Sequence, residues 1–241
     1  MKDKTKFFLF ALGLVIPALL IFKTIFSLNT LAWGDAVHFY KENFEELTSL
    51  PQAWVNRENN FGGINRVIWL YPLMLALGFL GKIGFSSEMA MRIIFYFPAV
   101  AISFLSAMFF AKKLGHSLKV QFFTSLVYSL NTYFLLLIDG GQSGVFLAYA
   151  LFPLPLLYLK KLLGEGGNKN FALSFLLLTL LILADPRVAV VCIIALFLWL
   201  ILETIFLKKT PLVKNFLSLI LLLFFETLIS LYWLIPLLVF G

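Results

Sequence analysis

Charged side chains are scarce in this sequence. They make up 13% of the 241 residues, whereas soluble domains average about 25%. Apolar residues reach 61% and the mean hydropathy is +0.97, which excludes a water-soluble globule. Disorder is excluded as well, because disordered chains combine low hydrophobicity with high net charge. The composition therefore indicates a protein that is solvated by lipid.

Cysteine is almost absent too. Cys192 is the single cysteine and lies inside an apolar run, so a disulfide framework and a cysteine metal site are excluded. The sequence also lacks the polar–apolar alternation, in segments of about ten residues, that builds a transmembrane β-barrel. Its apolar runs are continuous and rich in Leu and Phe. Backbone groups in lipid must hydrogen-bond within their own segment, so the sequence predicts an all-α polytopic membrane protein.

Seven apolar runs are long enough, or nearly so, to cross a bilayer. They are residues 7–28, 88–111, 120–138, 144–159, 171–184, 188–207 and 215–240. A further apolar stretch, 67–85, contains Pro72, Gly78, Gly81 and Gly84, which make it a poor continuous helix. We therefore predict about seven transmembrane helices, with 67–85 lying in the interface.

The lysines predict the topology. Most of them fall in four short clusters: Lys2/Lys4/Lys6, Lys112/Lys113/Lys119, Lys160/Lys161/Lys169 and Lys208/Lys209/Lys214. The positive-inside rule places all four in the cytoplasm, which requires that 67–85 does not cross. Residues 1–241 then form a single transmembrane module of the plasma membrane, with a cytoplasmic N-terminus and a large outer loop over about 29–87. This distribution explains the net charge of +7 without nucleic acid as a partner.

The outer loop begins with a candidate functional carboxylate. Asp35 follows Trp33, an interfacial residue type, and Gly34, which allows the backbone to turn towards the membrane surface. The alternative for Asp35 is an N-cap on a short amphipathic helix that ends near Leu47. His38 lies at i+3 from Asp35, on the same helix face, and could orient a ligand or bind a metal.

The arginines fall on the predicted outer side. They are Arg57, Arg66, Arg92 and Arg187. The planar fork of arginine suits phosphate, and the alternatives are interfacial snorkelling or pairing with carboxylates.

Two tight turns on the outer side supply further candidates. Asp139 and Gln142 lie in the turn DGGQSG, which is either a plain hairpin or a place where a ligand approaches the backbone. Asp185 and Pro186 form a typical helix start, and Arg187 could add to a phosphate site there. Glu226, roughly 18 Å from Lys214 along a helix, is either a functional carboxylate or a neutral one bonded between helices.

The layout resembles the GT-C superfamily of integral-membrane glycosyltransferases. The resemblance covers the whole chain and rests on seven spans, a large first outer loop and the segment WGDAVHFY, in which Asp35 occupies the place of the functional Asp. Arg92 matches an Arg that opens the second span. The segments NTYFLLLIDGGQSGVFLAYALFPL and YWLIPL are similar to the bacterial and archaeal branch related to arabinofuranosyltransferases.

The resemblance implies transfer of a sugar from a polyprenyl-phosphate donor to a glycan or lipid acceptor at the extracytoplasmic face. Asp35 would be the catalytic base, or would hold Mg²⁺ or Mn²⁺ as in metal-dependent members. The residues assigned to substrate binding are His38, Arg66, Arg92, Asp139, Gln142, Asp185 and Arg187. Relatives continue into a second outer loop and more spans, so we expect this chain to be the N-terminal part of a longer protein.

Two other functions stay open at this point. Glu226 and the short, broken spans are compatible with a transporter or lipid flippase, although the sequence shows no internal repeat. A non-catalytic membrane subunit is the third possibility.

Overall fold

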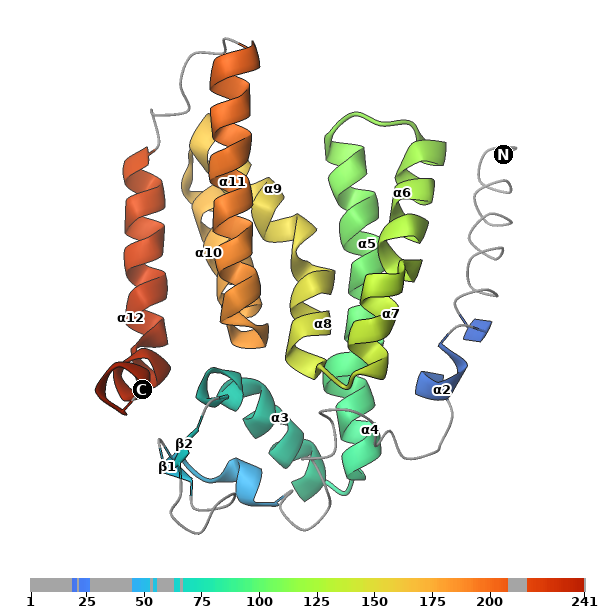
Figure 1. Cartoon of the computed structure of the whole chain (residues 1–241), viewed down its shortest axis with the longest axis vertical. Coiled ribbons are helices and arrows are strands. Elements are labelled where there is room, and N and C mark those ends of the chain that lie inside the picture. The colour runs from blue at the N-terminus through green and yellow to red at the C-terminus, as the bar shows by residue number, and fades with distance from the viewer. Residues whose placement is uncertain are drawn as a thin grey trace.

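The computed structural model describes residues 19–20, 22–26, 45–52, 54–55, 63–65, 67–207 and 216–240. These residues are almost entirely helical (Figure 1). In chain order the elements are α2 (Lys23–Phe26), η3 (Glu45–Thr48), β1 (Trp54–Val55), β2 (Gly63–Ile64), η4 (Ile68–Leu70), α3 (Tyr71–Lys82), α4 (Ser87–Met91), the π-helical turn η5 (Arg92–Tyr96), α5 (Phe97–Lys113), α6 (Leu118–Leu130), α7 (Thr132–Asp139), α8 (Ser143–Leu151), α9 (Pro153–Glu165), α10 (Asn168–Ala184), α11 (Pro186–Leu207) and α12 (Phe216–Phe240). The predicted all-helical class is confirmed, apart from one short antiparallel pair, β1 with β2.

The long helices run up and down beside one another (Figure 1). The loops 114–117 and 166–167 lie at one end of this bundle (Figure 1). The lysines of two clusters flank these loops: Lys112/Lys113/Lys119 and Lys160/Lys161/Lys169. The turn 140–142 and the junction at Asp185 lie at the opposite end, where α3 crosses beneath the bundle (Figure 1). The candidate residues of both outer turns therefore share one end of the molecule.

Four helical segments of the described chain are long and apolar enough to cross a membrane, which indicates a membrane protein. They are Ser87–Lys113, Leu118–Asp139, Pro186–Glu203 and Phe216–Val239. The pair α8 and α9, bent by 43°, is either a fifth, broken span or a re-entrant segment. Helix α10 has 17 residues, or roughly 25 Å, which is short for a hydrocarbon core of about 30 Å. The count of seven stays a prediction, and most of 7–28 lies outside the described residues.

Two predicted spans differ in form from the structure. The run 120–138 is interrupted at Asn131, whose extended backbone separates α6 from α7. The run 144–159 bends before Pro153, and its second half continues to Glu165. Proline lacks the N–H that a continuous helix needs and clashes with the preceding turn, so it begins α9 rather than extending α8.

Within the segment 67–85, α3 spans only 12 residues, roughly 18 Å. It begins at a proline-containing first turn and is followed by Gly84 at φ +96°. Its Gly78 lies against η3, since a Cβ there would come within 2.7 Å of the Thr48 side chain. Figure 1 shows α3 lying across the end of the bundle, and its interfacial position in a bilayer stays a prediction.

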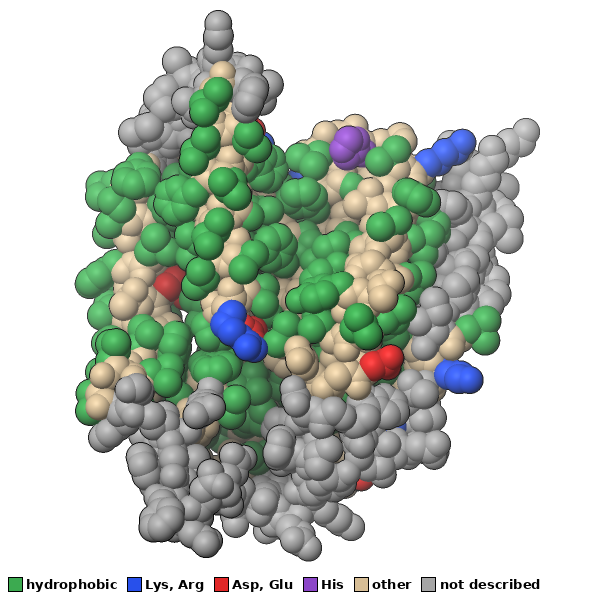
Figure 2. Space-filling model, in the orientation of Figure 1, with side chains coloured by type: hydrophobic (Ala, Val, Ile, Leu, Met, Phe, Trp, Pro, Cys, Tyr) green, Lys and Arg blue, Asp and Glu red, His purple; other side chains and the backbone are tan. Residues whose placement is uncertain are grey.

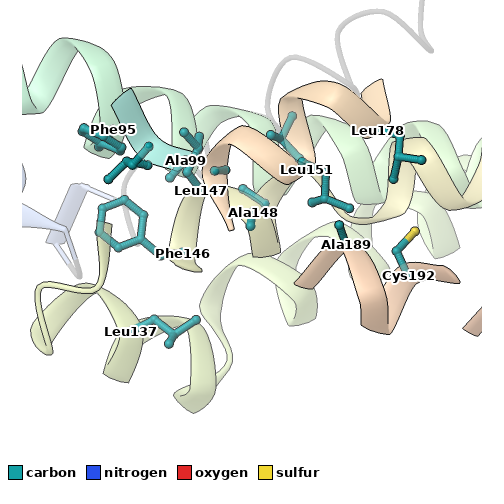
Figure 3. Packing of buried hydrophobic residues seen from close by; sticks show 14 of the residues in the cluster. Phe95, Ala99, Leu137, Phe146, Leu147, Ala148, Leu151, Leu178, Ala189 and Cys192 are labelled. Carbon is teal, nitrogen blue, oxygen red and sulfur yellow. The ribbon is translucent and has the colours of Figure 1, made fainter. Parts of the chain in front are cut away.

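A continuous apolar core joins the bundle helices. Figure 3 shows Phe95, Ala99 and Phe146 together in this core, with Cys192 further along it. Many apolar side chains also cover the outside of the bundle (Figure 2), as at Val190 and Phe224, which are 56% and 55% exposed. These side chains face away from the bundle, so no other helix covers them. Such an extended apolar surface is typical of helices that contact lipid.

We expect single cysteines to report the topology of the bundle. Residues His116 and Glu165 lie at the lysine-rich end and Asp139 at the other, and all three are exposed. A membrane-impermeant maleimide should label cysteine at 116 and 165 only from the cytoplasmic side, and at 139 only from outside. The native Cys192 is fully buried and should give little background. Labelling of 116 and 139 from the same side would contradict the bundle orientation.

Candidate functional site

A cavity of about 520 Å³ opens at the end of the bundle opposite the loops 114–117 and 166–167. It lies among α6, α7, α8 and the junction of α10 with α11, and we call it the tyrosine pocket. Its lining residues are Tyr128, Tyr133, Gln142, Val145, Tyr149, Phe152, Asp185, Arg187, Val188 and Val191. Three of the residues predicted to bind substrate, Gln142, Asp185 and Arg187, therefore line one cavity.

Asp185 forms one wall of the pocket and begins α11. Its Oδ1 accepts hydrogen bonds from the backbone N–H of Arg187 at 2.9 Å and of Val188 at 3.4 Å. This arrangement is an N-cap, so the predicted helix start at Asp185 and Pro186 is confirmed. The side chain is only 3% exposed, and its second oxygen, Oδ2, faces the guanidinium of Arg187.

Arg187 shares this carboxylate but keeps donors for a ligand. Its Nη2 donates to Asp185 Oδ2 at 2.6 Å, and its Nε lies 3.1 Å from Oδ1. Among the described residues, nothing accepts a hydrogen bond from Nη1. The side chain is 74% exposed, so a ligand in the pocket can reach this free edge of the guanidinium.

The opposite wall is a rigid pair of tyrosines that sequence reasoning did not identify. The rings of Tyr128 and Tyr149 stack at 4.4 Å with 9° between their planes. Each hydroxyl donates to the backbone carbonyl of the other residue, at 2.6 Å from Tyr128 and 3.1 Å from Tyr149. Tyr133 meets Tyr149 edge to face at 5.7 Å. Reciprocal hydrogen bonds and stacking together hold the aromatic wall in one arrangement.

Asn131 explains why this wall forms at the break between α6 and α7. Its Oδ1 caps α7 by accepting from the N–H of Phe134 at 2.9 Å. Its Nδ2 donates to the hydroxyl of Tyr149 at 2.6 Å and to the carbonyl of Tyr128 at 2.7 Å. A signal was present in the sequence, because YSLNTYF places an Asn, a helix-capping residue, between two tyrosines in an apolar run.

Two other predicted residues do not line the pocket. Arg92 is 3% exposed in η5, and its Nε donates to the backbone carbonyl of Ile25 at 2.9 Å. That bond ties the second span to α2. Asp139 is exposed at the end of α7. The following turn has Gly141 at φ +66°, in agreement with the tight turn predicted there.

The remaining assignments fall on residues outside the described part of the chain. Asp35, the catalytic candidate, and its neighbours His38 and Arg66 all belong to this group. Their roles stay predictions. Among the residues that the structure describes, no three His, Cys, Asp or Glu side chains come together as metal ligands. The expected Mg²⁺ or Mn²⁺ site stays a prediction.

No known protein family, no curated protein and no solved structure matches the chain.

Proposed function

We propose that this chain is a membrane module of a glycosyltransferase that uses a polyprenyl-phosphate sugar as donor, and that the tyrosine pocket holds part of that donor. One observation carries the proposal. The pocket gathers Gln142, Asp185 and Arg187 against an ordered aromatic wall, at the end of the bundle where an extracytoplasmic reaction is expected.

Arg187 is the group suited to the donor phosphate. Its guanidinium already holds Asp185 through two nitrogens, and the exposed Nη1 is free to donate to a phosphate oxygen. A planar fork can serve a carboxylate on one edge and a phosphate on another. The salt bridge to Asp185 fixes the guanidinium, so less side-chain entropy is lost when the phosphate binds.

The other lining residues suit a sugar ring. The face of an aromatic ring packs against the C–H groups of a saccharide, and Tyr133 is 57% exposed. Gln142 is exposed at the start of α8 and offers both an amide donor and an acceptor to hydroxyl groups. A mostly apolar cavity with a few placed polar groups is typical of small-ligand sites.

The lipid part of the donor has access from the side. Val188 and Val191 line the pocket on α11, and Val191 is 55% exposed towards the outside of the bundle. An isoprenoid chain could therefore lie along α11 while its phosphate and sugar enter the cavity.

In the proposed reaction, the acceptor hydroxyl attacks the anomeric carbon. The new C–O bond forms as the bond to the phosphate oxygen breaks, and the polyprenyl phosphate leaves with the bonding electron pair. Asp35 is the proposed base that takes the hydroxyl proton. Arg187 offsets the negative charge that develops on the leaving phosphate.

Replacement of Arg187 tests the pocket. Arg187→Gln should weaken binding of a polyprenyl-phosphate sugar, because a charge-assisted contact contributes about 1.5–3 kcal/mol. This corresponds to roughly a 10- to 150-fold rise in Kd. Binding would be measured with the protein in nanodiscs, and Lys119→Gln, at the other end of the bundle, serves as the matched loss of charge. Equal Kd values for both variants and the wild type would remove Arg187 from the donor site.

A transporter or lipid flippase is the second candidate. The bend of 43° between α8 and α9 favours it, since discontinuous helices form the substrate sites of many transporters. An assay in reconstituted vesicles distinguishes the two functions. A flippase would move the lipid-linked sugar between leaflets without an acceptor, whereas a transferase would release polyprenyl phosphate only when an acceptor is present. A non-catalytic subunit would do neither.

A further inference from the structure

A single carboxyl group lies in the middle of α12 and does not line the tyrosine pocket. Glu226 is ten residues from the start of the helix at Phe216, or roughly 15 Å along its axis. It is 4% exposed, whereas its neighbours Phe225 and Leu228 are each 45% exposed. Glu226 therefore points into the bundle from a helix whose other faces are largely exposed.

The partner of Glu226 is a threonine on α10. Oγ1 of Thr179 lies 3.0 Å from Oε1 and 3.1 Å from Oε2 of the carboxyl group. The same Oγ1 lies 2.9 Å from the backbone carbonyl of Phe175. Three acceptor oxygens thus surround a hydroxyl group that has only one hydrogen to donate.

The number of hydrogens available for these hydrogen bonds distinguishes the ionised carboxyl group of Glu226 from the protonated one. If the carboxylate is ionised, Thr179 is its one donor among the described residues, and the charge stays nearly unsolvated. If the carboxyl is protonated, its O–H donates to Thr179 Oγ1 while the hydroxyl donates to Phe175, as threonines in helices commonly do. Every hydrogen then has an acceptor.

No described cation offsets a charge at Glu226. The elements packed against α12 are α9, α10, η4 and β2. Their titratable side chains are Lys169 on α10 and Tyr158, Lys160, Lys161 and Glu165 on α9, while η4 and β2 carry none. Lys160 is paired with Glu203 at 2.5 Å, and Lys169 is ten residues from Thr179. On α12 itself, Tyr232 donates to the carbonyl of Trp69.

The surroundings are also apolar. The ring of Phe225 lies 6.5 Å, edge to face, from both Phe171 and Phe175 on α10. An unpaired charge among aromatic rings within a bilayer is costly, so the neutral form of the carboxyl is favoured.

We propose that Glu226 is a proton-binding site inside the membrane. The carboxyl carries a proton at neutral pH and donates it in a hydrogen bond to Thr179, which docks α12 on α10. Loss of this proton leaves a buried charge with one donor and weakens the contact between the two helices. The site is independent of the tyrosine pocket and of the function proposed for it.

Infrared spectroscopy tests this directly. The wild-type protein in nanodiscs at neutral pH should show the C=O stretching band of a protonated carboxyl, and Glu226→Gln should lack it. Glu203→Gln is the matched control and should keep the band, because Glu203 forms a salt bridge with Lys160 and, in the described part of the chain, bonds to neither Thr179 nor Glu226. Absence of the band from the wild type, or its persistence in Glu226→Gln, would overturn the proposal.

A second measurement uses the wild-type chain and does not depend on how a variant folds. A hydrophobic carbodiimide reacts with protonated carboxyls in lipid, so mass spectrometry should locate an adduct on Glu226 at neutral pH. An adduct that forms as fast at alkaline pH as at neutral pH would contradict the proposal, because loss of the proton removes the reactive form of the carboxyl.

The role of Thr179 is tested through the same infrared band. Thr179→Val should shift it, because the carboxyl loses its acceptor, whereas Thr227→Val, whose hydroxyl bonds within α12, should not. Equal bands in both variants would rule out the bond to Thr179.

Discussion

Asp35→Asn is expected to leave folding and membrane insertion intact and to lower sugar transfer at least about a hundredfold. Asn caps a helix about as well as Asp, so a structural role at the start of the predicted outer-loop helix would survive the change. The amide, however, has no basic oxygen that can take the proton of an acceptor hydroxyl. General-base assistance contributes roughly 10²–10⁴-fold to rate, and this is the largest effect expected of any single change in the chain.

The measurement is transfer from a polyprenyl-phosphate sugar in nanodiscs, with thermal unfolding recorded on the same samples. Glu165→Gln is the matched control, since Glu165 carries an exposed carboxyl group at the lysine-rich end of the bundle and has no predicted role in substrate binding. Transfer at the wild-type rate by Asp35→Asn would remove the catalytic role and leave Asp35 as a cap. The same assay, run on the wild type with and without Mg²⁺ or Mn²⁺, shows whether the rate of transfer depends on a metal ion.

The second large effect is expected at Gly144, in the first turn of α8. A Cβ built at this position would lie 2.4 Å from the backbone carbonyl oxygen of Ala184, the last residue of α10. A contact that short forces the two backbones apart. Gly144→Ala should therefore lower the free energy of unfolding by about 1–3 kcal/mol, the usual cost of overpacking.

The same change should also widen the tyrosine pocket. Gln142 precedes Gly144 by two residues and Asp185 follows Ala184, so the strained contact joins two walls of the cavity. We expect weaker donor binding together with a lower unfolding temperature. Leu136→Ala is the control, because it also changes an apolar side chain near the pocket. The side chain of Leu136 is 62% exposed, so its loss should change the unfolding temperature little. If Gly144→Ala unfolded at the wild-type temperature, α8 and α10 would not approach as closely as the contact between Gly144 and Ala184 requires.

Local sequence patterns determined the class of the protein and much of its segmentation. Composition alone identified a helical membrane chain, because lipid leaves few other ways to pair backbone groups. The start of α11 at Asp185 and Pro186 and the turn at Gly141 were predictable as well. Both depend on residues within one turn of each other.

The candidate site was only partly predictable. Gln142, Asp185 and Arg187 were recognised as separate polar residues in outer turns, but nothing local indicated that they line one cavity. The tyrosine pair, Tyr128 with Tyr149, was missed, since its two rings come from helices on either side of the chain reversal at 140–142. The substrate role of Arg92 stays a prediction, and the bond from its Nε to the carbonyl of Ile25, 67 residues away, was not predictable from any local pattern.

Only the tertiary structure decided these pairings. Thr179 and Glu226 are 47 residues apart, and Gly144 and Ala184 meet through the packing of α8 on α10. A helix in lipid can turn any face towards its neighbours with little change in hydrophobic energy, because lipid is as apolar as the core. Apolar periodicity therefore does not reveal which face is buried. The partner of each polar group follows from close packing and hydrogen bonding between helices, which a single sequence does not display.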